Sequence, residues 1–327
     1  MIALIFVVIL ILLFPFFFPG YYITELMMSF LPYLVWIVAI FMIISFVQLK
    51  KKMKSGYPHA ARRYFRGISF LAFCGLFFVW SKQFNNFYTT ESFTQQQTTG
   101  SLTILFANIH KDNKQYDEIQ TTISETNPDM LMFVEFADHH YAHLKAFLQK
   151  NYPYTNSTSR SKTFVWNMVF SKYPINNKAD DFPQGAWRYG YFSILHEHQE
   201  LYFYLVHTSS PDSYNHFLMR NEQLTTFVQD FQKHESDRKH DNIVVVGDFN
   251  ITPRSADYPI LDAAFSGKLV NATRHIPFLF SRTFKEFPLF SAHIDHVWTT
   301  PSFTISSLKT VDIPWSDHKW FLVALEL

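Results

Sequence analysis

Hydrophobic residues follow two different patterns along the chain, and the change falls near residue 85. Before that point they form long uninterrupted runs, whereas after it short apolar runs alternate with segments in which apolar residues recur every three or four positions. Uninterrupted runs of about 20 residues are typical of membrane-spanning helices, and the later alternation is typical of strands interleaved with helices. The pattern therefore predicts a membrane anchor at residues 1–84, followed by a folded α/β domain.

Three apolar runs in the first part predict transmembrane helices at about residues 2–19, 27–48 and 64–81. The first two contain no charge and are long enough to cross a bilayer core of about 30 Å at about 1.5 Å per residue. The third reaches that length only if Tyr64 and Phe65 belong to it. Because the first run has neither a positively charged start nor a small-residue cleavage site, we expect it to be retained and not removed as a signal peptide.

Charged residues divide the chain at the same place. Residues 1–85 contain eight Lys and Arg but one acid, Glu25, whereas the remainder contains 20 basic and 26 acidic residues. Seven of the eight basic residues lie between positions 50 and 66, where the positive-inside rule predicts a cytoplasmic loop. We therefore expect an integral protein of the inner or plasma membrane with its large domain on the periplasmic or extracellular side. If the third run lies only in the interface, that domain is cytoplasmic.

A polar stretch at residues 85–100, rich in Asn, Gln and Thr, predicts a linker between the anchor and a domain at residues 101–327. Within that domain the apolar pattern predicts strands at 102–107, 130–134, 163–170, 191–195, 201–206, 242–246, 294–298, 303–308 and 320–325. Spacings of three and four predict helices at 115–125, 139–149 and 217–231. Strands interleaved with helices indicate mixed sheets covered by helices.

Several classes of chemistry lack their sequence signatures. The single cysteine, Cys74, excludes disulfides and cysteine-rich zinc sites within one chain. The chain has only nine glycines, and it contains no Gly-x-Ser-x-Gly, no P-loop and no Gly-x-Gly-x-x-Gly. These absences argue against a serine hydrolase of the nucleophile-elbow type, a nucleotide triphosphatase and a dinucleotide enzyme.

Polar residues directly follow or end several of the predicted strands. Four short strings share this position: Val134-Glu135, Gly247-Asp248-Phe249-Asn250, Ile294-Asp295-His296 and Ser316-Asp317-His318. Strand ends converge on one edge of a sheet, where folded domains place their reactive groups. Carboxylates, an amide and imidazoles gathered there suit a hard divalent cation and a phosphate ester.

These strings occur in an order that resembles the endonuclease/exonuclease/phosphatase superfamily. Asn108, His207 and the segment from Phe170 to Ile175 complete the resemblance, which covers residues 101–327. It implies an α/β fold, a four-layer sandwich of two mixed β-sheets flanked by helices, here preceded by an N-terminal bundle of transmembrane helices. It also implies hydrolysis of phosphate ester bonds by a metal-activated water, with Mg²⁺, or Mn²⁺ in its place, as cofactor and no covalent intermediate.

The resemblance implies a role for individual residues. The metal ligands would be Asn108, Glu135, Asp248 and Asp317. The substrate would be bound by Asn108, Asn250, His207 and Arg188.

Five residues are the expected catalytic groups: His207, Asp248, Asn250, Asp295 and His318. Asp248 and Asn250 are two positions apart on an extended backbone, so they point the same way, toward the attacking water and a phosphoryl oxygen. Asp295 would orient His318 and raise its pKa, and His207 would bind the phosphate or act as general acid. The alternative for Asp248 and Asn250 is an Asx-turn that only shapes the following loop.

Other histidines are expected to be structural. His296 points to the opposite face from Asp295 in a strand, which predicts that it is packed in the core. His139, His140 and His143 include a pair at i, i+4 that suits zinc, but the glutamate of the metalloprotease pattern is missing. A solvated helix face is therefore expected there.

The substrate is defined less sharply. With 20 basic and 26 acidic residues, the region after residue 85 has a formal charge of −6, which argues against a duplex-DNA enzyme. An apolar segment, Pro277–Phe280 with Phe284, Phe287, Leu289 and Phe290, either packs within the domain or dips into a bilayer.

The expected function is a membrane-anchored, Mg²⁺-dependent phosphoesterase that acts on phosphodiester bonds in the manner of a nuclease. Its expected partners are a nucleic acid or a phospholipid headgroup and the lipid bilayer, with no obligate protein partner. A sphingomyelin or phospholipid phosphodiesterase, or a phosphoinositide phosphatase at the membrane, is the alternative. A second alternative is an inactive binding protein on the same fold.

Overall fold

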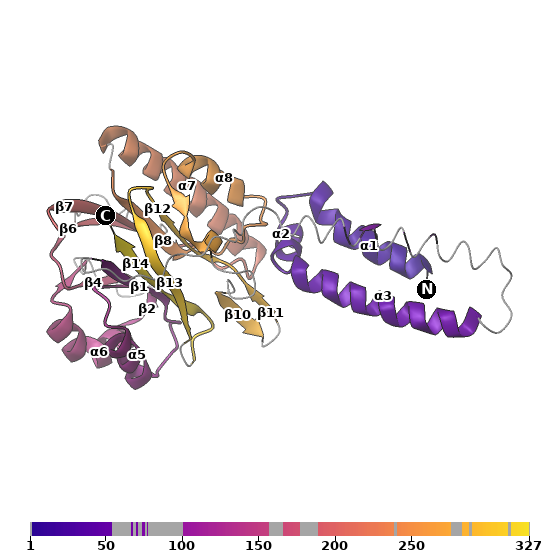
Figure 1. Cartoon of the computed structure of the whole chain (residues 1–327), viewed down its shortest axis with the longest axis horizontal. Coiled ribbons are helices and arrows are strands. Elements are labelled where there is room, and N and C mark those ends of the chain that lie inside the picture. The colour runs from indigo at the N-terminus through magenta and orange to yellow at the C-terminus, as the bar shows by residue number, and fades with distance from the viewer. Residues whose placement is uncertain are drawn as a thin grey trace. The chain divides into compact units, whose positions relative to one another are not determined.

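The computed structural model describes residues 2–53, 101–156, 166–176, 189–238, 241–275, 283–287, 290–312 and 315–326, with 67, 70, 74, 75 and 77 in addition (Figure 1). The chain divides into two compact units, Met1–Phe87 with Pro253–Ala256 and Tyr88–Thr252 with Asp257–Leu327. The predicted linker at residues 85–100 lies outside the described residues, and so does most of the third apolar run.

Residues 2–53 of the first unit form the helices α1 (Ile2–Phe17), α2 (Tyr22–Ser29) and α3 (Leu31–Met53). Leu12, Leu31, Val35 and Val38 form a small buried cluster within it. The sequence predicts one helix over 27–48 with a turn before it, but α2 ends at Ser29 and α3 begins at Leu31. Pro32 accounts for the break, because proline lacks an N–H and is tolerated in the first turn of a helix but not in its interior.

No single helix among the described residues is both long and apolar enough to cross a bilayer. Leu10–Phe17 and Tyr22–Ser29 reach the required length and composition only together, as a pair bent by 116°. The predicted spans at 2–19, 27–48 and 64–81 therefore stay predictions.

The second unit is built on two six-stranded sheets. The first has the strand order β13 (Thr304–Asp312), β14 (Lys319–Glu326), β1 (Leu102–Asn108), β2 (Met130–Phe136), β4 (Trp166–Ser171), β3 (Tyr154–Thr155). The second has the order β5 (Ile175–Asn176), β6 (Tyr189–His196), β7 (Gln199–His207), β8 (Ile243–Asp248), β12 (Asp295–Thr299), β9 (Val270–Asn271). A separate hairpin pairs β10 (Phe284–Phe287) with β11 (Phe290–Ala292). Both large sheets are mixed, because β1 and β2 are parallel in one and β7 and β8 in the other.

The main core lies between the two sheets. It contains side chains from both, among them Ile104, Phe106 and Met132 of the first sheet and Phe203 and Val246 of the second. Leu105 and Phe133 point to the other face of the first sheet, into a second apolar cluster. Both faces of the central strands are therefore buried, which explains why their sequences are nearly continuous apolar runs.

Helices cover the outer faces of both sheets (Figure 1). Ile119 and Ile123 of α5 (Tyr116–Thr126), with Leu144 and Leu148 of α6 (Asp138–Asn151), pack into the outer cluster of the first sheet. On the second sheet, Phe227 of α7 (Tyr214–Arg238) contacts Phe249, and Phe265 of α8 (Tyr258–Phe265) contacts Trp298. A short 3-10 helix, η2 (Ala272–His275), follows β9. The prediction of an α/β sandwich of two mixed sheets flanked by helices is confirmed.

Candidate active site

Strand pairing places three of the predicted residues in one row of the second sheet. His207 of β7 is paired with Asp248 of the parallel strand β8, and Asp295 of the antiparallel strand β12 is paired with the same Asp248. All three are buried. Gly247 permits the close contact of β7 and β8, because a Cβ atom at this position would lie 2.0 Å from the backbone oxygen of Val206. The ladder thus fixes these side chains without any special loop.

Glu135 comes from the first sheet, at the end of β2. The pairing of β2 with β4 shifts register between Phe133 and Phe136, so β2 carries a bulge there. Glu135 itself has φ +57°, a left-handed conformation that is rare for residues other than glycine. Bulges next to active sites commonly redirect a side chain. The Glu135 carboxylate is held in its position by a hydrogen bond of 3.0 Å that Oε2 accepts from the backbone N–H of Lys111.

Asn108, at the end of β1, connects the two sheets. Its Oδ1 accepts a hydrogen bond from the backbone N–H of His110 at 3.1 Å. Its Nδ2 donates to Asp248 Oδ2 at 3.0 Å and to Glu135 Oε1 at 3.3 Å. Asn108 therefore presents a donor to both carboxylates in this structure, and its predicted role as an oxygen ligand of the metal stays a prediction.

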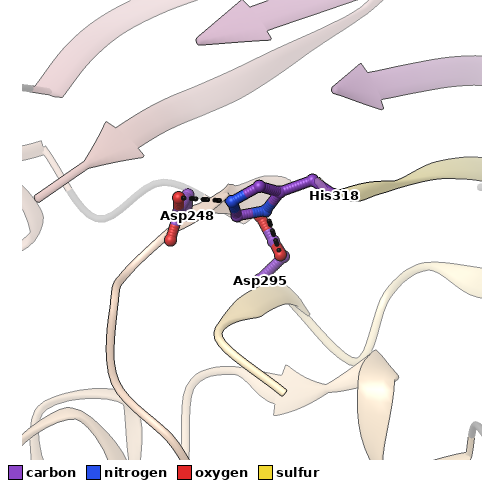
Figure 2. Close-up of side chains that lie close together, drawn as sticks. All are labelled: Asp248, Asp295 and His318. Atoms are coloured by element: carbon purple, nitrogen blue, oxygen red, sulfur yellow. Dashed lines mark hydrogen bonds and ion pairs between the residues drawn. The ribbon is translucent and has the colours of Figure 1, made fainter. Parts of the chain in front are cut away.

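His318 precedes β14 of the first sheet and reaches across to the second. Its Nδ1 lies 2.9 Å from Asp295 Oδ2, and its Nε2 lies 3.6 Å from Asp248 Oδ2 (Figure 2). Since a carboxylate only accepts, Nδ1 carries the proton of the first contact. Ser316 positions the segment by donating from Oγ to the backbone oxygen of Asn108 at 3.0 Å and accepting from the N–H of His318 at 3.1 Å. The structure thus brings the predicted Asp295–His318 pair together.

Burial and mutual charge shift the pKa values of these groups. Burial lowers the pKa of His318, but the adjacent carboxylates of Asp295 and Asp248 outweigh it and raise this pKa to about 10. Burial and the charge of Asp295 raise the pKa of Asp248 to about 8. For Glu135, burial has the largest single effect and raises the pKa, but His207, the N–H of Lys111, Asn108 and His318 together outweigh it, so its pKa is lowered.

Asn250 follows β8 in a left-handed conformation, with φ +50°. Its N–H donates to Asp248 Oδ1 at 2.9 Å, and its Nδ2 donates to the backbone oxygen of Thr208 at 2.9 Å. The Asx-turn considered from the sequence is therefore present. It occupies Oδ1 of Asp248 and leaves Oδ2 of the same carboxylate facing Asn108 and His318, so Asp248 both shapes the loop and contributes to the site.

The remaining predicted residues are placed unequally. His207 Nε2 lies 3.7 Å from Glu135 Oε1, so this imidazole belongs to the same group. Arg188 lies outside the described residues. Asp317 is next to His318 but is not part of the cluster of candidate metal-binding atoms described below. Its predicted role as a metal ligand stays a prediction.

The other histidines have structural partners. His296 is completely buried, its Nε2 lies 2.9 Å from the backbone oxygen of Ile251, and burial lowers its pKa to about 4, as expected for a packed residue. His139 contacts the backbone oxygen of Lys111 through Nε2, and His140 that of Asn113. Contrary to the expected solvated helix face, these two rings are bound to the loop after β1.

The predicted apolar segment, Pro277–Phe280 with the Phe and Leu residues up to Phe290, lies mostly outside the described residues. Its Phe284 is described and packs against the ring of His318.

The donor set fits a hard divalent cation. In the part of the chain that the structure describes, Asp248, Asp295 and His318 have candidate ligand atoms within 4.8 Å of one another. Asp295 Oδ1 is buried and has no hydrogen-bond partner. Glu135 Oε1 and Asp248 Oδ2 both face Nδ2 of Asn108. Carboxylate oxygens concentrated in this way are the ligands that Mg²⁺ and Mn²⁺ prefer.

Some groups that build the site have no obvious signal in the sequence. The Thr283 hydroxyl accepts from the backbone N–H groups of both Ile294 and Asp295 at 3.1 Å, although it lies 11 and 12 residues earlier in the chain. Ser316 could have been found from its place two residues before His318, at the spacing of a hydroxyl-capped turn. The contribution of the Lys111 N–H could not have been found from the sequence, because almost every residue has a backbone N–H.

Two mixed sheets packed face to face, with carboxylates, an amide and imidazoles at one edge, are the arrangement of a phosphate ester hydrolase. The sequence profile of the endonuclease/exonuclease/phosphatase family matches residues 104–318, and the chain belongs to this family. The protein is accordingly a hydrolase acting on phosphate ester bonds. A search of curated protein sequences finds no significant match.

Solved structures of similar fold include three with low sequence identity. D. rerio TDP2 in complex with a single-strand DNA product is 14% identical, with a TM-score of 0.53 over 70% of this chain and 100% of that chain. The human Nocturnin catalytic domain with bound sulfate is 14% identical, with a TM-score of 0.53 over 71% and 96%. A Bacteroides thetaiotaomicron mannosyl-6-phosphatase is 15% identical, with a TM-score of 0.51 over 69% and 100%. At these identities the likeness concerns the fold alone.

Proposed function

We propose that the protein hydrolyses a phosphodiester bond by in-line attack of water, with Mg²⁺ as the physiological cation. The observation that carries the proposal is the convergence of both sheets on one point. The Asp295–His318 pair lies beside Asp248, and Asn108 connects Asp248 with Glu135. A single bound phosphate group would be within reach of donors and acceptors from both sheets.

Each residue has a distinct part in this reaction. Mg²⁺, when bound by Glu135 and Asp248, would neutralise charge on the phosphoryl oxygens. His318 is oriented by Asp295, so its Nε2 lies 3.6 Å from Asp248 Oδ2 and, when protonated, would donate to a phosphoryl oxygen in the transition state. Asp248 Oδ2 would position the attacking water, and His207 would bind the phosphate or protonate the leaving oxygen.

A nucleic acid is the substrate class that we favour. D. rerio TDP2, which has a similar fold, was crystallised with a single-strand DNA product. The region after residue 85 has 20 basic and 26 acidic residues, and this negative balance favours a short or single-stranded substrate over a long duplex, because duplex binding depends on many phosphate contacts.

A phospholipid headgroup is the second candidate, and one specific observation favours it. Residues 2–53 form three helices that are largely apolar, and basic residues are concentrated between positions 50 and 66. We propose that this unit anchors the protein in a membrane with the domain on the periplasmic or extracellular side, which would bring the site close to lipids.

The experiment is a substrate panel with the full chain in detergent micelles. Single-stranded DNA, duplex DNA, RNA, vesicles of sphingomyelin or phosphatidylinositol phosphates, and mannose 6-phosphate are each incubated with Mg²⁺ or EDTA. We expect Mg²⁺-dependent cleavage of single-stranded nucleic acid, reduced at least 10³-fold in the Asp295→Asn variant. Hydrolysis of the vesicle lipids alone would favour the second candidate. No hydrolysis of any diester by folded protein would contradict the proposal.

A further inference from the structure

Arg220 and Gln223 are among the buried polar side chains of helix α7. Arg220 and Gln223 are three positions apart, so they project in similar directions, and they are 2% and 3% exposed. Arginine is rarely buried to this extent unless it has specific partners.

Arg220 contacts the segment that follows β8. Its Nη1 donates to the backbone oxygen of Asn250 at 3.1 Å, and its Nη2 donates to Asp257 Oδ2 at 3.2 Å. Nε and Nη2 both donate to Asn221 Oδ1, and the guanidinium lies 5.0 Å from the ring centre of Phe217. These contacts use the planar fork of the guanidinium from several sides, so its orientation is fixed.

Gln223 contacts the segment that follows β7. Its Oε1 accepts a hydrogen bond from the backbone N–H of Ser209 at 2.8 Å, two residues after His207. Thr208, between His207 and Ser209, connects the segment after β7 with the segment after β8. Its N–H donates to the backbone oxygen of Asp248, and its own backbone oxygen accepts from Asn250 Nδ2. Both site segments of the second sheet are thus connected to α7 and to each other.

The backbone conformation of Asn250 suggests what the contact with Arg220 does. Its φ of +50° is left-handed, a conformation that asparagine adopts more readily than other residues except glycine but still at some cost, so neighbouring contacts help to hold it. The Arg220–Asn250 hydrogen bond stabilises the peptide group that follows this residue. Buried ion pairs can often be replaced by apolar side chains without loss of stability. Stability alone therefore does not explain why Arg220 also donates to a backbone oxygen in the site.

We propose that Arg220 and Gln223 are positioning residues that orient Asn250 and His207 for contact with the phosphate group. The inference rests on the proposed function of those two side chains. Arg220 acts through the backbone of Asn250, and Gln223 acts through the backbone of Ser209, so neither residue needs to touch the substrate.

A double-mutant cycle in the full chain tests the kinetic consequence. Arg220→Lys keeps a positive charge near Asp257 but removes the fork, and we expect kcat to fall 10- to 100-fold with KM changed less than threefold. Asn250→Ala should lower kcat at least as much. If Arg220 acts through Asn250, the double variant is no slower than Asn250→Ala by more than threefold. Losses that multiply would overturn the inference.

Amide hydrogen exchange tests the positioning without any assay of activity. We expect Arg220→Lys to speed exchange in residues 248–252 at least tenfold, and Gln223→Leu to do so at Ser209, whereas amides of 243–246 inside β8 stay protected. Gln223→Glu, which retains the acceptor, should restore protection at Ser209. Arg274→Lys is the matched control, because its ion pair with Asp262 is partly exposed.

The two readouts separate the two proposals. Unchanged exchange at residues 248–252 in Arg220→Lys would overturn the positioning role even in an active enzyme. A wild-type chain that hydrolyses no phosphodiester but shows the expected exchange would contradict the proposed function and leave the structural connection supported.

Discussion

The two sheets contribute to the site in different ways. In the second sheet, His207, Asp248 and Asp295 lie in one row, fixed by regular strand pairing. In the first sheet, Glu135 reaches the site through a bulge and a left-handed backbone, and its side chain is 22% exposed. One half of the site is therefore as stable as the ladder that carries it, whereas the other half depends on local exceptions to regular geometry.

His318 joins the two halves. It belongs to the segment that leads into β14 of the first sheet, yet it is paired with Asp295 of the second. The pair forms only when the sheets are packed against each other, so the chemistry depends on the complete sandwich.

The largest effect is expected where the halves meet. His318→Gln removes the charge-assisted bond to Asp295 and the donor that faces Asp248, so we expect kcat/KM for a phosphodiester to fall about 10³- to 10⁴-fold. Steady-state kinetics of the full chain with saturating Mg²⁺ measures this fall. A loss of less than tenfold would show that His318 does not take part in catalysis.

The second effect concerns the regular half. A Cβ at Gly247 would meet the backbone oxygen of Val206 at 2.0 Å, and backbone cannot move aside cheaply. We expect Gly247→Ala to lower the free energy of unfolding by about 3 kcal/mol. Gly267→Ala is the control, because Gly267 has φ +74° but open space around it, and should cost about 1 kcal/mol. Equal costs in denaturant titrations would contradict the close contact of β7 and β8.

The third effect concerns the irregular half. Glu135→Gln removes the carboxylate that we propose as a metal ligand while the bulge remains, so we expect the dissociation constant for Mg²⁺ or Mn²⁺ to rise about 10- to 100-fold. High metal concentration should restore part of the activity, unlike in His318→Gln. Isothermal titration calorimetry measures the affinity, and an unchanged dissociation constant would remove Glu135 from the metal site.

One buried histidine in each half should contribute less to stability in acid. Burial lowers the pKa of His140, on the helix that covers the first sheet, to about 4, and likewise that of His296 in the second sheet. Each contributes stability above pH 6.5 that is lost as pH falls toward 4, because the unfolded chain binds the proton more readily. We expect a loss of about 2 kcal/mol per histidine at pH 5.

Unfolding titrations at pH 7 and pH 5 check this contribution when His296→Gln is compared with the wild type, because Asp248 and His318, whose pKa values are raised, change the stability in the opposite direction in both proteins. Between pH 7 and pH 5, His296→Gln should lose about 2 kcal/mol less stability than the wild type, even if it is less stable at both. A difference as large in this variant as in the wild type would show that His296 is already protonated in the folded protein.

The smallest effect is expected at the surface. Lys285 Nζ lies 2.8 Å from Asp312 Oδ1, but both side chains are largely exposed. Lys285→Ala should therefore change the free energy of unfolding by less than about 1 kcal/mol. A larger change in thermal unfolding would indicate that the β10–β11 hairpin contributes more to stability than its exposure suggests.

Long elements could be predicted from the sequence because their apolar positions are repeated often. The predicted strand at 242–246 appears as Ile243–Asp248, and the predicted helix at 217–231 appears within Tyr214–Arg238. The two-residue strands β3, β5 and β9 and the helix α8 were missed. A strand of two residues is too short to show an alternating apolar pattern. The eight residues of α8 cover little more than two helical turns, which gives only a weak helical pattern.

The site could be predicted as far as it depends on strand ends. The gathering of Asp248, Asp295 and His318 at one place follows from residues at the ends of apolar runs, and the contact of His318 with Asp295 was expected from the family resemblance. The bulge at Glu135 and the direction of the Asn108 amide do not follow from either, because they depend on tertiary contacts that no local pattern records. The same is true of the contact between Arg220 and Asn250, which are 30 residues apart.

The most direct test of the account is the metal-dependent hydrolysis of bis-p-nitrophenyl phosphate by the full chain, compared between one variant from each sheet. We predict activity with Mg²⁺, none with EDTA, recovery on adding Mg²⁺ back, and loss in both Glu135→Gln and Asp295→Asn at limiting metal. Full activity in either variant, or activity that persists in EDTA, would contradict a single site built jointly by the two sheets.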